Sequence, residues 1–168
     1  NIISDNMIKR LSEIFFNYNI VPGTDWDGNY DNTVFLEWIN YCKKWAKEED
    51  REAVILHTIG NGLSYAKRNE KGLIAEFIMA ELNKADNEEM RKGYRLGVYN
   101  QRGATWIDPE GKPEFALAEK YNKIAEEAES LGYANYAETL RMIADTYINE
   151  AKRNIKEYKQ EKEEEEEI

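Results

Sequence analysis

The feature of the sequence that most limits the fold is the spacing of its apolar residues. From Ser4 to Ile20 and from Thr33 to Lys47, large apolar side chains recur every three or four residues. That is the period of an α-helix with one buried face. No segment alternates β-branched with polar residues, as a half-buried strand would. The sequence therefore predicts an all-α protein, a compact bundle of six to seven helices.

A third helical segment begins near Glu49 and keeps its period to Ala66, through the stretch "IGNG". Gly60 and Gly62 fall inside it, and each glycine in a helix interior costs about 1 kcal/mol relative to alanine. We expect one helix with small residues at a close helix crossing, or alternatively a break near Asn61.

Four more helices follow, and most carry a recognisable start or stop signal. They are expected at 73–84, at 86–100 with Asp86 and Glu89 as a capping box, at 113–131 with Pro113 in its first turn and Gly132 after its end, and at 135–158 with Asn135 and Glu138 as its cap. The last two helices are expected to form a long antiparallel hairpin.

The length and the cysteine content limit the organisation of the chain. A chain of 168 residues fits one domain, which we expect over residues 1–160, followed by an acidic C-terminal tail over 161–168. Cys42 is the only cysteine, so no disulfide can form within the chain and a reducing compartment, the cytoplasm, is expected. The first residues show neither the charged nor the apolar region of a signal peptide.

The charge balance argues against some classes of partner. The net charge is −10, and binding to nucleic acid or to a membrane surface depends on clustered lysine and arginine. We therefore expect neither nucleic acid nor a membrane as the partner. No apolar run approaches the roughly 18 residues of a membrane span.

Motifs for metal, nucleophilic or phosphate chemistry are absent or fail on spacing. In "DWDGNYDN", Asp25, Asp27, Asn29 and Asp31 alternate like calcium ligands, but the glycine and the final glutamate of a calcium loop fall at the wrong positions. We interpret the segment as a turn before a helix. The single histidine, His57, has no partner at zinc-ligand spacing, and the sequence contains no phosphate-binding loop. No metal and no cofactor are expected.

Cys42 shares a predicted apolar face with Phe35, Trp38, Ile39 and Trp45. We interpret it as a packed, unreactive thiol rather than as a nucleophile paired with His57.

The segment 91–114 is the best candidate for a functional site. It holds four of the ten glycines, at positions 93, 97, 103 and 111, together with three arginines. The structural interpretation is that the glycines allow a close helix contact while the arginines pair with carboxylates. The alternative is a ligand site in which aromatic rings stack a planar group and arginines bind an anion. Its residues would be Arg91, Arg95, Tyr99, Asn100, Arg102, Trp106 and Asp108.

Two functions are consistent with these observations. The first is a non-enzymatic module that acts through a protein partner or through self-association, with an exposed apolar patch expected on the terminal hairpin. The second is a small-molecule or anion-binding domain, with or without hydrolytic activity, centred on residues 91–108. If the loops 21–32 and 101–112 meet, Trp26 and Trp106 would bracket its cleft.

Overall fold

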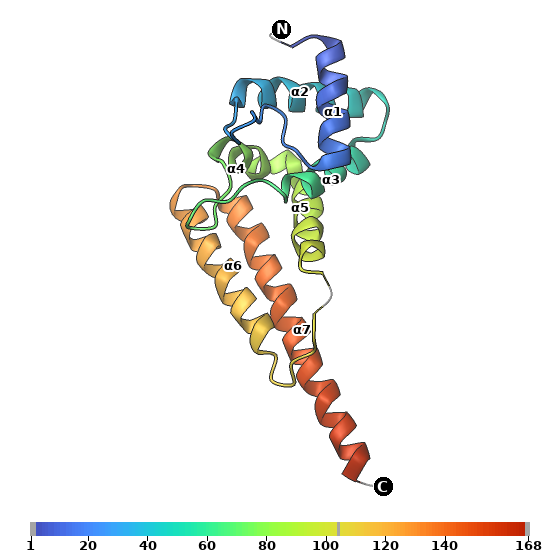
Figure 1. Cartoon of the computed structure of the whole chain (residues 1–168), viewed down its shortest axis with the longest axis vertical. Coiled ribbons are helices and arrows are strands. Elements are labelled where there is room, and N and C mark those ends of the chain that lie inside the picture. The colour runs from blue at the N-terminus through green and yellow to red at the C-terminus, as the bar shows by residue number, and fades with distance from the viewer. Residues whose placement is uncertain (1–2, 104, 167–168) are drawn as a thin grey trace. The chain divides into compact units, whose positions relative to one another are not determined.

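The computed structural model describes residues 3–103 and 105–166, and within them the chain is all-α, as predicted (Figure 1). No β-strand occurs in this described part, where the one extended pairing is an isolated bridge between Thr24 and Tyr30. The helices are α1 (Asp5–Tyr18), α2 (Asn32–Glu48), α3 (Glu52–Leu63), α4 (Glu76–Asn83), α5 (Glu88–Gln101), α6 (Lys112–Ser130) and α7 (Ala134–Glu166), with a short 3₁₀ turn η1 (Ala85–Asn87) before α5.

The chain divides into two compact units, residues 1–100 and 101–168. The first contains α1 to α4, η1 and nearly all of α5, and the second contains α6 and α7. One domain over residues 1–160 stays a prediction, since a single domain can contain two compact units.

The central helix of the first unit is α3, which is covered on opposite faces. Its residue Gly60 lies against the backbone of α5, where an added Cβ would overlap the Met90 carbonyl oxygen and lie 2.9 Å from the Tyr94 nitrogen. Two residues further on, Gly62 lies against the ring of Phe15 from α1. The stretch "IGNG" therefore lies within one continuous helix, without a break at Asn61. Its glycines are explained by the neighbouring α5 and Phe15, which leave no room for a side chain.

The contact between α3 and α5 is close from both sides. A Cβ on Gly93 of α5 would overlap the His57 carbonyl oxygen and lie 3.0 Å from the Asn61 nitrogen. One turn later, a Cβ on Gly97 would lie 2.7 Å from the Asn61 carbonyl oxygen. The predicted close helix crossing is thus present, and it uses glycines of both helices.

An aromatic cluster joins α1, α2 and α4. Trp38 lies between Phe15 and Phe35, with ring centroids 4.9 and 6.1 Å away, and its indole N–H donates to Ser12 Oγ at 2.9 Å. Phe35 also contacts Phe77 of α4, at 4.9 Å between centroids. Trp38 is completely buried, so its one polar atom needs the partner that Ser12 provides.

The second unit is the predicted antiparallel hairpin of α6 and α7 (Figure 1). Gly132 adopts a positive φ of 90° and ends α6, as predicted. Tyr121 of α6 and Tyr147 of α7 stack with centroids 6.0 Å apart. The acidic block does not end the helix, because α7 continues through Glu166. Positions 167 and 168 of the predicted tail lie outside the described residues.

Three predicted helix starts are wrong. The fifth helix begins at Glu88, so Asp86 lies inside η1 and does not form the predicted capping box with Glu89. The fourth helix begins at Glu76 rather than Leu73, because the Leu73 N–H is taken by the Asn69 side chain in a turn, at 3.0 Å. Leu73 and Ile74 are still buried. The last helix begins at Ala134, so Asn135 is a helical residue and not its cap.

Replacing Gly93 with alanine tests the close crossing. The new Cβ meets backbone atoms, which no side-chain rotation can relieve, so we expect a loss of about 3 kcal/mol or more in the free energy of unfolding. Urea unfolding of the full chain measures it. Gly28→Ala is the control, because its Cβ meets nothing within 4 Å and only its positive φ of 81° is unfavourable, by about 1 to 2 kcal/mol. A Gly93→Ala protein as stable as the wild type would contradict the crossing.

Candidate functional site

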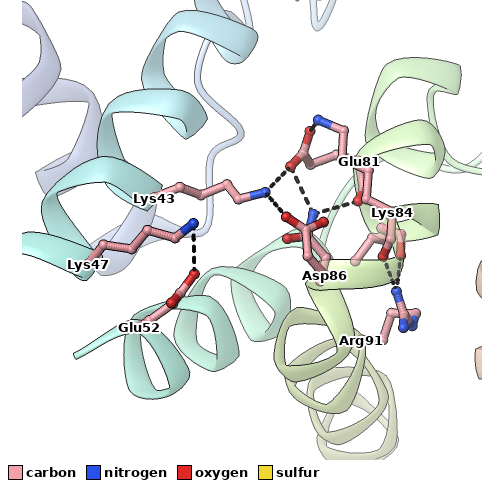
Figure 2. Close-up of polar contacts among 9 residues, drawn as sticks. Lys43, Lys47, Glu52, Glu81, Lys84, Asp86 and Arg91 are labelled. Atoms are coloured by element: carbon pink, nitrogen blue, oxygen red, sulfur yellow. Dashed lines mark hydrogen bonds and ion pairs between the residues drawn. The ribbon is translucent and has the colours of Figure 1, made fainter. Parts of the chain in front are cut away.

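Arg91, the first residue of the predicted site, closes the end of α4. Its guanidinium Nη1 donates to the carbonyl oxygens of Leu82 at 2.9 Å and Lys84 at 2.6 Å (Figure 2). The Leu82 carbonyl lies in the last turn of α4, where the helix itself offers no further N–H, and the Lys84 carbonyl directly after the helix also accepts from the Asn87 N–H at 3.1 Å. Burial lowers the pKa of Arg91, although the nearby carboxylates of Glu88 and Asp86 act in the opposite direction. Arg91 therefore has a structural role, in which its guanidinium satisfies two backbone carbonyl oxygens.

Beside Arg91 lies a buried carboxylate that the sequence analysis missed. Glu81 is only 1% exposed, and it accepts hydrogen bonds from Lys43 at 3.3 Å, from Asn87 at 2.8 Å and from Lys84 (Figure 2). Lys43 also pairs with Asp86 at 3.6 Å. The Asn87 side chain donates a second bond to the Glu81 carbonyl oxygen at 2.7 Å. The group ties α2 to the junction of α4 and η1.

The charge state of Glu81 follows from these contacts. Burial alone raises the pKa of this carboxyl, but the hydrogen bonds from Lys84 and Asn87 and the charge of Lys43 outweigh it and hold the pKa below its ordinary value. Glu81 is therefore ionised and fully used by its partners at neutral pH. Its carboxylate bonds join three helical segments of the first unit, so we assign it a structural role.

The next three predicted site residues lie further along α5. Arg95 is half-buried, while Tyr99 and Asn100 are exposed near the end of the helix. They belong to the first unit, as Arg91 does, whereas Arg102, Trp106 and Asp108 belong to the second.

Arg102 is engaged inside the second unit. Its guanidinium pairs with Glu114 and with Glu150, the latter at 3.0 Å, and lies 5.5 Å from the centroid of the Tyr147 ring. Burial lowers the pKa of Arg102, but the hydrogen bond with Glu114 and the charge of Glu150 raise it above its ordinary value. Arg102 thus joins the loop before α6 to both helices of the hairpin. Glu114 and Glu150 take the guanidinium N–H groups that were predicted to bind an anion.

Asp108 and Trp106 have different roles in the segment 105–111 before α6. Asp108 Oδ1 accepts from the backbone N–H of Glu110 at 2.9 Å and of Lys112 at 3.3 Å, so it stabilises the turn that starts α6. Trp106 is 95% exposed and lines a hollow of about 500 Å³ together with residues of α7. Of the predicted site residues, Trp106 is the one that lines this hollow. A common site for all seven stays a prediction, as does the meeting of loops 21–32 and 101–112.

The other candidates of the sequence analysis have structural environments. Asp25 accepts from the backbone N–H of Asn29 at 2.8 Å and of Asp27 at 2.9 Å, and Asp31 caps α2 through Thr33 and Val34. The segment is the predicted turn. No group of three or more metal-ligating side chains occurs within the described residues.

Cys42 is 5% exposed, and burial raises the pKa of its thiol to about 11, although a hydrogen bond with Ser12 acts in the opposite direction. The thiol is therefore protonated at neutral pH, in agreement with its interpretation as a packed residue.

A groove on the first unit was not predicted. It has a volume of about 350 Å³ and is lined by side chains of α1, α2 and α3: Ile8, Lys9, Ser12, Glu13, Phe16, Tyr41, Cys42, Trp45 and Ile55. Trp45 was predicted to share the buried stripe of α2 but is 40% exposed. The sequence did contain a signal for this groove. Phe16 and Tyr41 are aromatic residues that lie outside the apolar faces predicted for the first two helices.

Comparison of the chain with models of protein families, with curated proteins and with solved structures finds no match. None of the described helices is long and apolar enough to cross a membrane.

Glu81→Gln tests the buried cluster through its pH dependence. At pH 7 we expect a loss of about 2 kcal/mol in unfolding free energy, since hydrogen bonds to a charged group are replaced by weaker ones. Because the folded pKa of Glu81 lies below its ordinary value of 4.5, the stabilisation is present above that value and is lost as the pH falls through the folded pKa. The wild type and the variant should therefore converge in acid.

The control is Glu48→Gln, which removes an exposed carboxylate of α2 that lies 3.8 Å from Lys44. It should change stability little at any pH. A constant difference between Glu81→Gln and the wild type from pH 7 into acid would show that the charge of Glu81 is not what stabilises the fold.

Proposed function

We propose that this protein is a non-enzymatic interaction module that binds an amphipathic helix of a protein partner in the groove of α1, α2 and α3. The observation that carries the proposal is the set of partly exposed aromatic side chains along this groove. Phe16, Tyr41 and Trp45 are 41%, 39% and 40% exposed. Aromatic residues that keep a large part of their surface in water are the usual anchors of protein interfaces.

The shape of the groove suits a helix. It is lined by side chains of three helices, most of them apolar or aromatic, and amphipathic helices bind such grooves through residues spaced at i, i+3, i+4 and i+7. A volume of about 350 Å³ accommodates two or three large apolar side chains. Burial of these aromatic faces by the partner would supply the main part of the binding free energy.

The charges on the rim favour a particular kind of helix. Lys9 and Glu13 line the groove one helical turn apart on α1, both are exposed, and neither makes an ion pair with another described residue. A partner helix complements them if it carries an acidic and a basic residue one turn apart beside its apolar stripe. The proposed partner is therefore an amphipathic helix with mixed charge at its edge.

Two further observations support this choice over the alternatives. Exposed large apolar residues on the terminal hairpin, such as Phe115, Leu131 and Met142, are spread over both helices and line neither the groove nor the hollow. The anion-binding alternative loses support because Arg91 and Arg102 bond to groups of this chain. We place the interaction in the cytoplasm, because the single, buried Cys42 suits a reducing compartment.

The test is a selection of amphipathic helical peptides, from a displayed library, for binding to the full chain. We expect peptides with an apolar stripe and mixed edge charges. Their affinity, measured by fluorescence anisotropy, should fall roughly thirtyfold with Trp45→Ala, since truncation of a central aromatic anchor costs about 2 kcal/mol. Trp26→Ala is the matched control, because Trp26 is a fully exposed tryptophan of the same unit in a loop outside the groove.

The same peptide-binding measurement also tests the roles of Lys9 and Glu13 on the rim of the groove. A Lys9→Glu and Glu13→Lys double variant should weaken the selected peptides and be rescued by peptides with the two edge charges exchanged. Selected peptides that bind Trp45→Ala as tightly as the wild type would contradict the proposal. A dimer of the chain that is dissociated by Trp45→Ala would contradict it as well, by assigning the groove to a second copy.

A further inference from the structure

The first unit carries a second apolar surface, the α1 stripe, which consists of Met7, Leu11, Ile14 and Tyr18. Their spacing of four, three and four residues places the side chains on one face of the helix. Met7 and Ile14 are each 41% exposed, Tyr18 is 71% exposed, and Leu11 is half-buried. Apolar side chains that adjoin one another and remain open to water mark an interaction surface.

The α1 stripe is separate from the groove. Lys9 and Phe16, which line the groove, lie about half a helical turn away from the centre of the stripe. Ile8 and Phe15 lie between these two sides and are buried in the core of the unit. The helix therefore buries one face and presents two different surfaces, one on each side of it.

The spacing of the α1 stripe suits a second copy of the same helix. Apolar residues that recur alternately after four and three residues form the seam of a two-stranded coiled coil. If two copies of α1 run antiparallel about a two-fold axis, Leu11 of each copy lies opposite Ile14 of the other, and Met7 lies opposite Tyr18. The outer pairs bring a thioether against an aromatic ring, which is a favourable contact. The stripe is thus complementary to itself.

The residues beside the α1 stripe also suit a second copy. On its solvent side the exposed residues are Asn6, Arg10 and Asn17, so this flank has no acidic residue although the chain has a net charge of −10. In the antiparallel arrangement Arg10 of each copy lies beside Asn17 of the other, whose amide oxygen accepts a hydrogen bond. In a parallel arrangement the two Arg10 side chains would meet and repel each other. The charges therefore favour the antiparallel pair.

We infer that the chain forms a symmetric dimer in which the α1 stripes of two copies pack antiparallel. Burial of the apolar side chains drives the association. The groove of each copy stays open, because its α1 residues lie on the other side of the helix. The dimer forms without any partner helix, so its existence does not depend on the function proposed for the groove.

Sedimentation equilibrium of the full chain, from micromolar to millimolar concentration, tests the inference. We expect a monomer–dimer equilibrium with a dissociation constant in the micromolar range, because an interface of one helix per copy is small. Ile14→Lys should raise that constant thirtyfold or more, since it places a charge at the centre of the seam. Tyr18→Lys, at a more exposed position, should act in the same direction. Val54→Lys is the control, because Val54 is 66% exposed on α3 of the same unit, outside the stripe.

A double variant, Arg10→Glu with Asn17→Lys, tests the orientation of the helices. In the antiparallel dimer each new glutamate lies beside the new lysine of the other copy, so the variant should dimerise several-fold more tightly than the wild type. A weaker dimer would overturn the antiparallel arrangement, because like charges meet in a parallel one.

Three results would overturn the dimer itself or its assignment to the α1 stripe. The first is a chain that stays monomeric at millimolar concentration. The second is a dimer that Ile14→Lys and Tyr18→Lys leave intact while circular dichroism shows both variants folded. The third is a dimer that Val54→Lys or Trp45→Ala dissociates as strongly as Ile14→Lys does, because that result would place the contact elsewhere on the unit or in the groove.

Discussion

The first unit depends on the crossing of α3 and α5, where backbone meets backbone. The two helices can lie this close because Gly60 of α3 and Gly93 and Gly97 of α5 have no side chain. A Cβ on any of the three would overlap atoms of the facing helix. On the other side of α3, Gly62 is covered by Phe15 of α1, while Val54 on a third side stays exposed. The remaining helices of the unit are arranged around a helix that is buried from both directions. Because packing is this close, an added atom at the crossing would strain the backbone of both helices.

The concentration of glycine and arginine in residues 91–114 is explained mainly by this architecture. The two helical glycines serve the crossing, and Gly111 adopts a positive φ of 65° beside Ala151 at the start of α6. Arg91 closes α4 and Arg102 ties the loop before α6 to the hairpin. An acidic chain can hold such arginines without any ligand, because carboxylates and carbonyl groups of its own satisfy them. The groove of α1, α2 and α3 contains neither of these arginines.

Local signals in the sequence predicted the helices well because period, caps and breakers act over a few residues. Pro113 and Gly132 bound α6 as expected, and the buried apolar residues of α7, from Tyr136 to Ala151, recur at helical spacing. The candidate sites were less predictable, because they depend on which helix covers which face. The burial of Glu81 requires Lys43 from another helix, and the exposure of Trp45 follows from a groove that one helix alone cannot reveal.

The most direct test of this account is native-state hydrogen exchange of the full chain. If the crossing holds the first unit together, amides of residues 57–63 in α3 and 91–98 in α5 should exchange only through global unfolding of that unit. Amides of α1, which forms one wall of the groove, should exchange through openings of lower free energy. Faster exchange in the crossing than in α1 would contradict the claim that the glycine contact is the interaction on which the rest of the unit depends.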